Sequence, residues 1–161
     1  MKKYLLLFFA WSALLAACQS SGNLVVGSGD RQATPLPPAP TLSPDAIALG
    51  QQVYVEYCAA CHGAELEGEP EWKSPNEDGS FRAPPHDASG HTWHHSDSVL
   101  IEAIRLGGAR LPANIGGSSN MPAYDDILTE AEMLAVLAYI KRSWPAELRE
   151  AQWEQTAQTQ P

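Results

Sequence analysis

The stretch Cys58-Ala59-Ala60-Cys61-His62 decides how this chain of 161 residues folds and what it carries. Its two thiols are separated by two residues, and an imidazole follows the second thiol directly. Each thiol can add to a vinyl group of one porphyrin to form a thioether, while the adjacent imidazole ligates the iron from the same side. The sequence therefore predicts one covalently bound haem c, with Cys58 and Cys61 as its attachment points and His62 as the proximal iron ligand.

Two other kinds of site use a Cys-x-x-Cys pair, and the rest of the chain favours neither. A thioredoxin-like redox pair follows a strand and belongs to a sheet, for which this sequence shows no pattern. A four-ligand zinc site wants a second cysteine pair, whereas the only other cysteine is Cys18. Haem attachment is the interpretation that fits the motif best.

The second axial position of the iron requires another strong ligand if the protein only transfers electrons. Met121, in Asn120-Met121-Pro122, is the candidate, because it lies in a long loop before the clearest predicted helix. Met133 is the alternative, but it falls inside that helix, where a thioether is an ordinary core filler. With His62 and Met121 both on the iron, no site is open to a small-molecule substrate. The sequence therefore predicts electron transfer rather than catalysis, at a relatively high potential.

These motifs resemble those of the class I c-type cytochromes, over roughly residues 44–145. The resemblance extends to Gly50 and Tyr54 in the first predicted helix and to Val136 and Tyr139 in the last. It implies an all-α cytochrome c fold, in which three to four short helices and long irregular loops surround one covalently bound haem. It also implies that the first and last helices cross closely, which agrees with a glycine and aromatic rings at the contact.

The same resemblance implies further residues of the haem crevice. In this family a proline carbonyl lies against the ring nitrogen of the proximal histidine, and Pro84 and Pro85 are the candidates. Trp93 is expected either to donate its indole N–H to a haem propionate or to pack as a wall of the crevice, where Tyr124 is also expected. The chain departs from compact members in a longer segment before the two prolines, which leaves open which of them is used. The acidic residues of that segment include Glu65, Glu67, Glu69 and Glu71.

The first residues predict export and a lipid anchor. Residues 1–17 combine Lys2 and Lys3, an apolar run and small residues before a cleavage point, as in a signal peptide. The run of about a dozen apolar residues is shorter than the roughly 20 that a membrane-spanning helix needs. Leu15-Ala16-Ala17-Cys18 resembles a bacterial lipobox, in which the cysteine is acylated and becomes the first mature residue. An ordinary secretory peptide with an incidental thiol at Cys18 is the alternative.

The predicted organisation has four parts. The signal peptide covers 1–17, and the lipidated cysteine with a flexible Ser/Gly/Pro-rich tether covers 18–43. The cytochrome c domain covers 44–145, and a C-terminal tail with at most a frayed helical turn covers 146–161. The protein is thus expected on a bacterial membrane, facing the periplasm or the cell exterior. Which membrane holds the lipid stays open.

Capping signals predict three helices inside the domain. Their expected ranges are about 44–57, 97–106 and 130–143. Ser43 caps the first helix, Ser96 caps the second, and Thr129 with Glu132 forms a capping box for the third. Residues 64–95 show neither a helical nor a strand period, and we expect no strand.

The charge of the chain limits its partners. The formal net charge is −9, and removal of Lys2 and Lys3 with the leader leaves 8 basic and 19 acidic residues, a charge of −11. Such a balance disfavours nucleic acid as a partner. It favours long-range attraction to positively charged redox proteins, but it does not identify the donor or the acceptor.

Two questions stay open from the sequence. The histidine-rich stretch could hold a second metal such as copper or zinc, or its side chains could lie at the surface and haem edge; its members are His86, His91, His94 and His95. The function also has alternatives to a free electron carrier. The chain could be a haem-bearing subunit of a larger redox complex, or a peroxidase-like or gas-binding haem protein if Met121 does not bind the iron.

Overall fold

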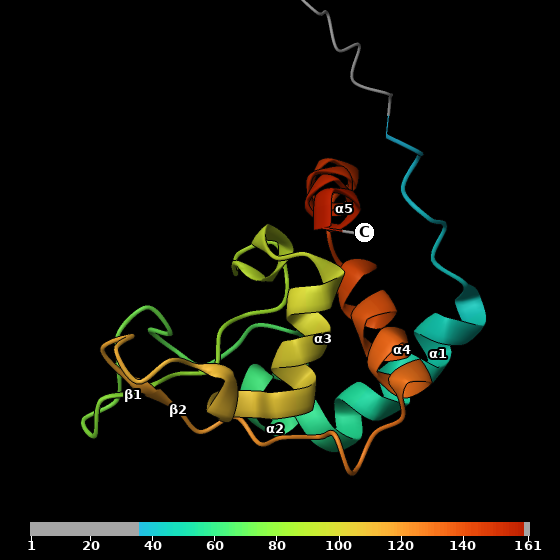
Figure 1. The fold of residues 1–161 in the computed structure, drawn as a ribbon. Coiled ribbons are helices and arrows are strands. Elements are labelled where there is room, and N and C mark those ends of the chain that lie inside the picture. Colours follow the sequence, from blue (N-terminus) through green and yellow to red (C-terminus); the bar gives the residue numbers. More distant parts are fainter. Residues whose placement is uncertain (1–35, 160–161) are drawn as a thin grey trace, which may run out of the picture. The chain divides into compact units, whose positions relative to one another are not determined.

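The computed structural model describes residues 36–159, so the predicted signal peptide, Cys18 and most of the tether lie outside the described residues. Helices joined by long loops make up this part of the chain (Figure 1), in agreement with the predicted all-α fold. The α-helices are α1 (Pro44–Val53), α2 (Ala59–His62), α3 (Asp97–Leu106), α4 (Glu130–Lys141) and α5 (Ala146–Thr159). None of these helices is long and apolar enough to cross a bilayer.

The first helix carries the cysteine motif at its end. α1 begins as predicted, with Pro44 in its first turn and the Ala46 N–H donating to Ser43 Oγ at 3.5 Å. After Val53 the chain stays helical through a π-helical turn, η1 (Tyr54–Cys58), and continues into α2. The helix is therefore longer than the predicted range of 44–57. Such π turns are frequent at functional sites, and this one ends at Cys58, the first residue of the cysteine motif.

α1 and α4 cross at close range (Figure 1), as the resemblance implied. A Cβ at Gly50 would overlap the Ala135 carbonyl and lie 2.9 Å from Tyr139 Cβ, so only glycine fits this contact. The rings of Tyr54 and Tyr139 pack beside it with their centroids 5.3 Å apart. The crossing belongs to the hydrophobic core, whose buried members include Val53, Tyr54, Met133, Val136, Tyr139, Ile140 and Trp144.

The capping box of α4 is present as predicted. The Glu132 N–H donates to Thr129 Oγ1 at 3.3 Å, and the Glu132 carboxylate accepts the Thr129 N–H at 2.8 Å. These bonds satisfy donors that a helix start otherwise leaves unpaired. α4 ends at Lys141, slightly before the predicted end at about residue 143.

The expectation of a tail with at most a frayed turn after residue 145 was wrong, because residues 146–159 form α5. This helix docks through buried polar side chains rather than an apolar stripe, and for that reason its sequence shows no helical period. Gln152 is 1% exposed and Thr156 is 3% exposed. Thr156 Oγ1 accepts the Asp97 N–H at 3.1 Å, and Gln152 Nε2 donates to Asp97 Oδ1 at 2.6 Å.

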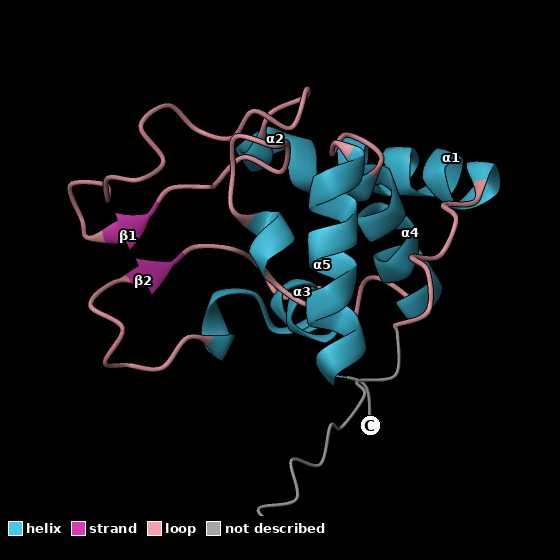
Figure 2. Ribbon diagram, turned by 90° about the horizontal axis from the view of Figure 1, so that it is seen from above, coloured by secondary structure: helices cyan, strands magenta, loops and turns pink. Residues whose placement is uncertain are grey.

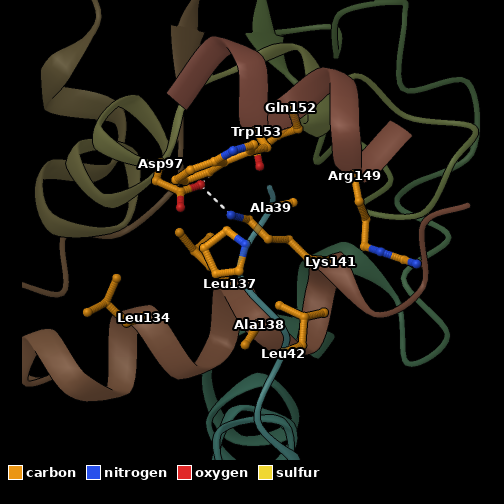
Figure 3. Close-up of a pocket in the computed structure, with 11 residues that line it drawn as sticks. Ala39, Leu42, Asp97, Leu134, Leu137, Ala138, Lys141, Arg149, Gln152 and Trp153 are labelled. Atoms are coloured by element: carbon orange, nitrogen blue, oxygen red, sulfur yellow. Dashed lines mark hydrogen bonds and ion pairs between the residues drawn. The ribbon is translucent and has the colours of Figure 1, made fainter. Parts of the chain in front are cut away.

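These contacts replace the cap that we expected at the start of α3. The Ser96 side chain makes no capping bond and pairs instead with Ser98 Oγ at 2.9 Å. The helix start is satisfied from α5, which is distant in sequence. Lys141 of α4 also reaches Asp97, with Nζ 2.5 Å from Oδ1. One polar cluster thus joins α3, α4 and α5 (Figure 3).

A groove lies beside this cluster. A space of about 180 Å³ is lined by Ala39, Pro40 and Leu42 and by residues of α3, α4 and α5, among them Lys141 and Trp153 (Figure 3). The indole N–H of Trp153 donates to the Pro37 carbonyl at 2.7 Å, which holds the described start of the chain against α5. None of the residues that line the groove belongs to the predicted haem site.

A two-residue parallel bridge joins two loops, although the sequence predicted no strand. β1 (Ser80–Phe81) pairs with β2 (Ser118–Ser119), with Ser80 opposite Ser118 and Phe81 opposite Ser119. Figure 2 shows the pair at the ends of two long loops, away from the helices. A strand of two residues is too short to display an alternating pattern, so the sequence carries no sign of it.

Replacing Gln152 by Leu is expected to lower the free energy of unfolding by about 2–3 kcal/mol, because the partly shielded Asp97 carboxylate loses a hydrogen-bond donor. Denaturant unfolding of the haem-loaded protein, followed by circular dichroism, measures this change. Gln155→Leu makes the same substitution at an exposed position of α5 and should change the value by less than about 0.5 kcal/mol. Equal effects of the two substitutions would contradict docking of α5 through its polar side chains.

Candidate haem site

The imidazole of His62 is buried and held in one orientation. It ends α2, and the residue is 8% exposed. Nδ1 lies 2.8 Å from the Pro84 carbonyl, which can only accept, so Nδ1 carries the proton. Nε2 is then the unprotonated nitrogen, with a lone pair for a metal. Burial lowers the pKa of His62, partly offset by the Pro84 bond and the Glu69 charge, and this favours the neutral form that a metal ligand needs.

The structure separates the roles of the two candidate prolines. Pro84 is the one whose carbonyl accepts the hydrogen bond from His62. Pro85 is buried, and its own carbonyl accepts from Thr92 Oγ1 at 3.4 Å. Gly68 packs against the bond between the prolines, where a Cβ would lie 2.7 Å from the Pro84 carbonyl carbon. Pro85 therefore holds the turn that presents Pro84.

Tyr54 fixes the main chain behind the imidazole. Its side chain is completely buried, and its hydroxyl lies 2.8 Å from the Gly63 carbonyl and 3.2 Å from the His62 carbonyl. Burial raises the pKa of Tyr54, so the phenol remains a hydrogen-bond donor. The hydroxyl satisfies carbonyls that a helix end leaves unpaired. The sequence placed Tyr54 at the helix crossing but gave no sign of this second role.

Cys58 is partly buried and Cys61 is exposed, and no disulfide joins them. Burial, with a smaller contribution from Cys61, raises the pKa of the Cys58 thiol to about 11. Redox-active Cys-x-x-Cys pairs instead lower the pKa of a cysteine to make it a thiolate. The electrostatics of this pair therefore disfavour the thioredoxin-like alternative.

Two buried donors in residues 36–159 have no protein partner, and they provide a test of whether the site fits haem. They are Trp93 Nε1 and Arg82 Nε. An unpaired buried donor costs about 1–3 kcal/mol, and more when it is charged, so native proteins seldom leave one. The propionates of haem are acceptors that an indole and a guanidinium can both satisfy. The two donors thus fit the group, and Arg82, which lies in no motif, is a candidate that the sequence did not reveal.

The loop that carries Met121 is held through its main chain. The Gly108 N–H donates to the Met121 carbonyl at 2.9 Å, and the Met121 N–H donates to Ser119 Oγ at 3.2 Å. The Met121 residue is partly exposed. Met133, the alternative ligand, is 1% exposed inside the core of α4. Of the two methionines, Met133 is therefore the one with an ordinary packing role.

Tyr124 ties the Met121 loop to the helix that carries the cysteines. It is 9% exposed, and its hydroxyl donates to the Tyr57 carbonyl at 2.8 Å. The two tyrosine rings meet edge to face with their centroids 5.9 Å apart. Since Tyr57 directly precedes Cys58, this contact brings the end of the Met121 loop to the start of the cysteine motif.

The four histidines of the histidine-rich stretch do not gather at one point, although His91 and His95 are in contact. His86 stacks on His62, His91 stacks on Trp72, and His94 stacks on Trp93, while His95 meets His91 edge to face. Burial lowers the pKa of His86 well below its usual value. Among residues 36–159, no group of three or more His, Cys, Asp or Glu side chains is placed to hold a metal ion. This part of the chain offers no support for a second metal.

Trp93→Phe is expected to destabilise the haem-loaded protein by about 1.5–3 kcal/mol, because a hydrogen bond to a charged carboxylate is lost. The measurement is denaturant unfolding followed by haem absorption. Trp72→Phe is the matched control, since the Trp72 indole stacks on His91 and is not a buried unpaired donor. A Trp93→Phe protein as stable as the unmodified one would leave Trp93 as a wall of the crevice only.

Comparison with known proteins agrees with this geometry. The family model described as Cytochrome c matches residues 47–144, a range that includes the cysteine motif, Met121 and both crossing helices. No curated protein matches the chain. The match covers more than half of the 161 residues, so the chain belongs to the cytochrome c family of haem-binding electron-transfer proteins.

Proposed function

We propose that this chain is a monohaem c-type cytochrome that carries single electrons between redox proteins and acts on no small substrate. Thioethers to Cys58 and Cys61 would hold the haem, with His62 and Met121 as the axial ligands. The observation that carries the proposal is the 2.8 Å bond from His62 Nδ1 to the Pro84 carbonyl. It holds the imidazole in the tautomer that a metal ligand needs, directly after two thiols.

The bound haem supplies a one-electron ferric/ferrous couple, and the residues of the chain set the conditions for it. Burial of His62 and the bonds of Tyr54 keep the proximal ligand in one position. Trp93 Nε1 and Arg82 Nε are buried donors suited to the propionates. A thioether from Met121 favours the ferrous state, so we expect a relatively high potential.

The proposal extends to the location of the protein. Residues 1–17 would direct export, and a lipid on Cys18 would anchor the chain to a membrane through residues 19–43. The support is the lipobox-like sequence alone, because Cys18 and most of the tether lie outside the described residues. Since Pro37 is bonded to Trp153 of α5, the 18 residues from Gln19 to Leu36 would span the distance to the anchor, and a flexible chain of this length reaches roughly 20–25 Å. With a formal charge of −11 after cleavage, the partner surface is expected to be positive.

Met121→Leu is expected to abolish the far-red charge-transfer band of methionine on ferric haem and to lower the reduction potential. The measurements are optical spectra of both oxidation states and a redox titration. Met133→Leu is the same substitution in the core of α4 and should retain the band, since this swap conserves volume.

Two other outcomes of that experiment would contradict the proposal. Loss of the band in Met133→Leu alone would make Met133 the ligand. An unmodified protein with high-spin spectra and no such band would have an open iron site, which fits the peroxidase-like or gas-binding alternative. Stable co-purification with an oxidase or dehydrogenase would instead support a subunit of a larger complex.

Cys18→Ser is expected to move the protein from the membrane fraction to the soluble fraction, because the thiol that accepts the lipid is lost. Fractionation of the expressing cells followed by intact mass measures this. A Cys18→Ser protein that stays with the membrane would contradict the lipid anchor while leaving the haem site unaffected.

A further inference from the structure

The long segment between His62 and the prolines contacts both parts of the chain that would supply iron ligands, the end of α2 and the Met121 loop. We propose that residues 76–84, here called the brace, hold the Met121 loop in place from the proximal side of the site. The inference rests on the proposed function, because it concerns the position of Met121 relative to the iron. Its evidence is a continuous series of contacts from His62 to Met121.

The brace is fixed at its proximal end by two residues. The Pro84 carbonyl accepts the His62 bond at 2.8 Å. The preceding residue, Ala83, is bound on both sides by Glu69: the Glu69 N–H donates to the Ala83 carbonyl at 2.9 Å, and the Ala83 N–H donates to Glu69 Oε2 at 2.5 Å. This end of the brace therefore cannot move without disturbing the orientation of His62.

Near its middle the brace is joined to the Met121 loop by the β1–β2 bridge. Phe81 lies opposite Ser119 in the parallel register, and its ring covers Gly117, where a Cβ would lie 2.6 Å from Phe81 Cζ. Ser119 in turn accepts the Met121 N–H through Oγ at 3.2 Å. Only one residue separates the bridge from Met121. The bridge is thus the point where the brace contacts the Met121 loop.

The brace is also stiff within itself. Ser80 is 1% exposed, and both its N–H and its hydroxyl donate to Asp78 Oδ1, at 2.9 Å and 2.6 Å. Asn76 donates its main-chain N–H to the Ser80 carbonyl at 2.8 Å and its side-chain amide to Ser80 Oγ at 3.0 Å. These hydrogen bonds make the brace rigid, so the position of β1 depends on the position of Pro84.

The residues between His62 and the brace also have a fixed conformation. Leu66 and Glu71 adopt positive φ values of 71° and 53°, which non-glycine residues seldom do. Such residues persist only where the surrounding structure over-determines them. Leu66 is 4% exposed, and its carbonyl accepts the His86 N–H at 2.8 Å. The segment between His62 and Pro84 is therefore an ordered part of the site rather than a flexible surface loop.

The brace is expected to lower the population of molecules in which Met121 has left the iron. An added ligand such as imidazole binds ferric iron only when the methionine has moved away, so its apparent affinity reports the population of that open state. Loosening the bridge would weaken only the state in which Met121 is on the iron. The loss would equal the contribution of a small number of hydrogen bonds. We expect the apparent affinity for imidazole to rise about tenfold.

The experiment compares Phe81→Ala with Leu134→Ala in the ferric, haem-loaded protein. Phe81 is 40% exposed and lies in the bridge, whereas Leu134 is 50% exposed and lies on α4. Imidazole is titrated while the far-red band is followed, and unfolding midpoints are measured in parallel. Tighter imidazole binding in Phe81→Ala alone supports the brace. Equal imidazole affinity in all three proteins, or equal increases in both variants, would overturn it.

Amide hydrogen exchange keeps this inference separate from the proposed function. The Met121 N–H is protected by Ser119 Oγ whether or not the thioether binds iron. We expect its exchange to be about tenfold faster in Phe81→Ala than in Leu134→Ala. A haem-loaded protein without the methionine band would refute the axial role of Met121, while this exchange rate would still support or overturn the brace.

Discussion

The hydrogen bond from His62 Nδ1 to the Pro84 carbonyl is the contact on which the site depends. It joins the end of the first helix to a loop more than twenty residues away, and it determines which ring nitrogen is left for a metal. Further contacts fix the positions of both His62 and Pro84. The Tyr54 hydroxyl fixes the main chain at His62, and buried Pro85, packed against Gly68, fixes the carbonyl. The imidazole orientation is thus a property of the folded protein.

The helical frame keeps this arrangement in place through two different kinds of contact. α1 and α4 cross at Gly50 by close backbone approach and aromatic packing, in the usual manner of a hydrophobic core. α5 instead docks on the start of α3 through Gln152, Thr156 and the Asp97 carboxylate. Buried polar contacts of this kind stabilise only when every partner is satisfied. They therefore make the position of α5 specific rather than adaptable.

The sequence predicted the features whose signals are local. The caps at Ser43 and Thr129 follow from neighbouring residues, whereas the first helix continues through the cysteine motif to His62, past its predicted end at about residue 57. The close crossing at Gly50 and the candidate carbonyl of Pro84 came from the resemblance to a family, and the structure shows both contacts. What could be predicted of the site was thus its ligand candidates and one pair of prolines.

The features that the sequence did not reveal depend on partners distant in the chain. α5 has no apolar stripe because it packs on α3 through buried polar groups. Thr156 of α5, and not Ser96, accepts the hydrogen bond at the start of α3. The β1–β2 bridge is too short for a period, and Arg82 belongs to no motif. In each case a contact between loops or helices, rather than a pattern within one segment, decides the structure.

The most direct test of the central claim is mass mapping of proteolytic peptides from protein expressed with a haem-attachment system. The account predicts that the peptide containing Cys58 and Cys61 carries the mass of one haem and that neither thiol reacts with an alkylating reagent. A peptide without haem, whose two cysteines are alkylated, would contradict covalent attachment at this motif. It would remove the basis for His62 and Met121 as axial ligands.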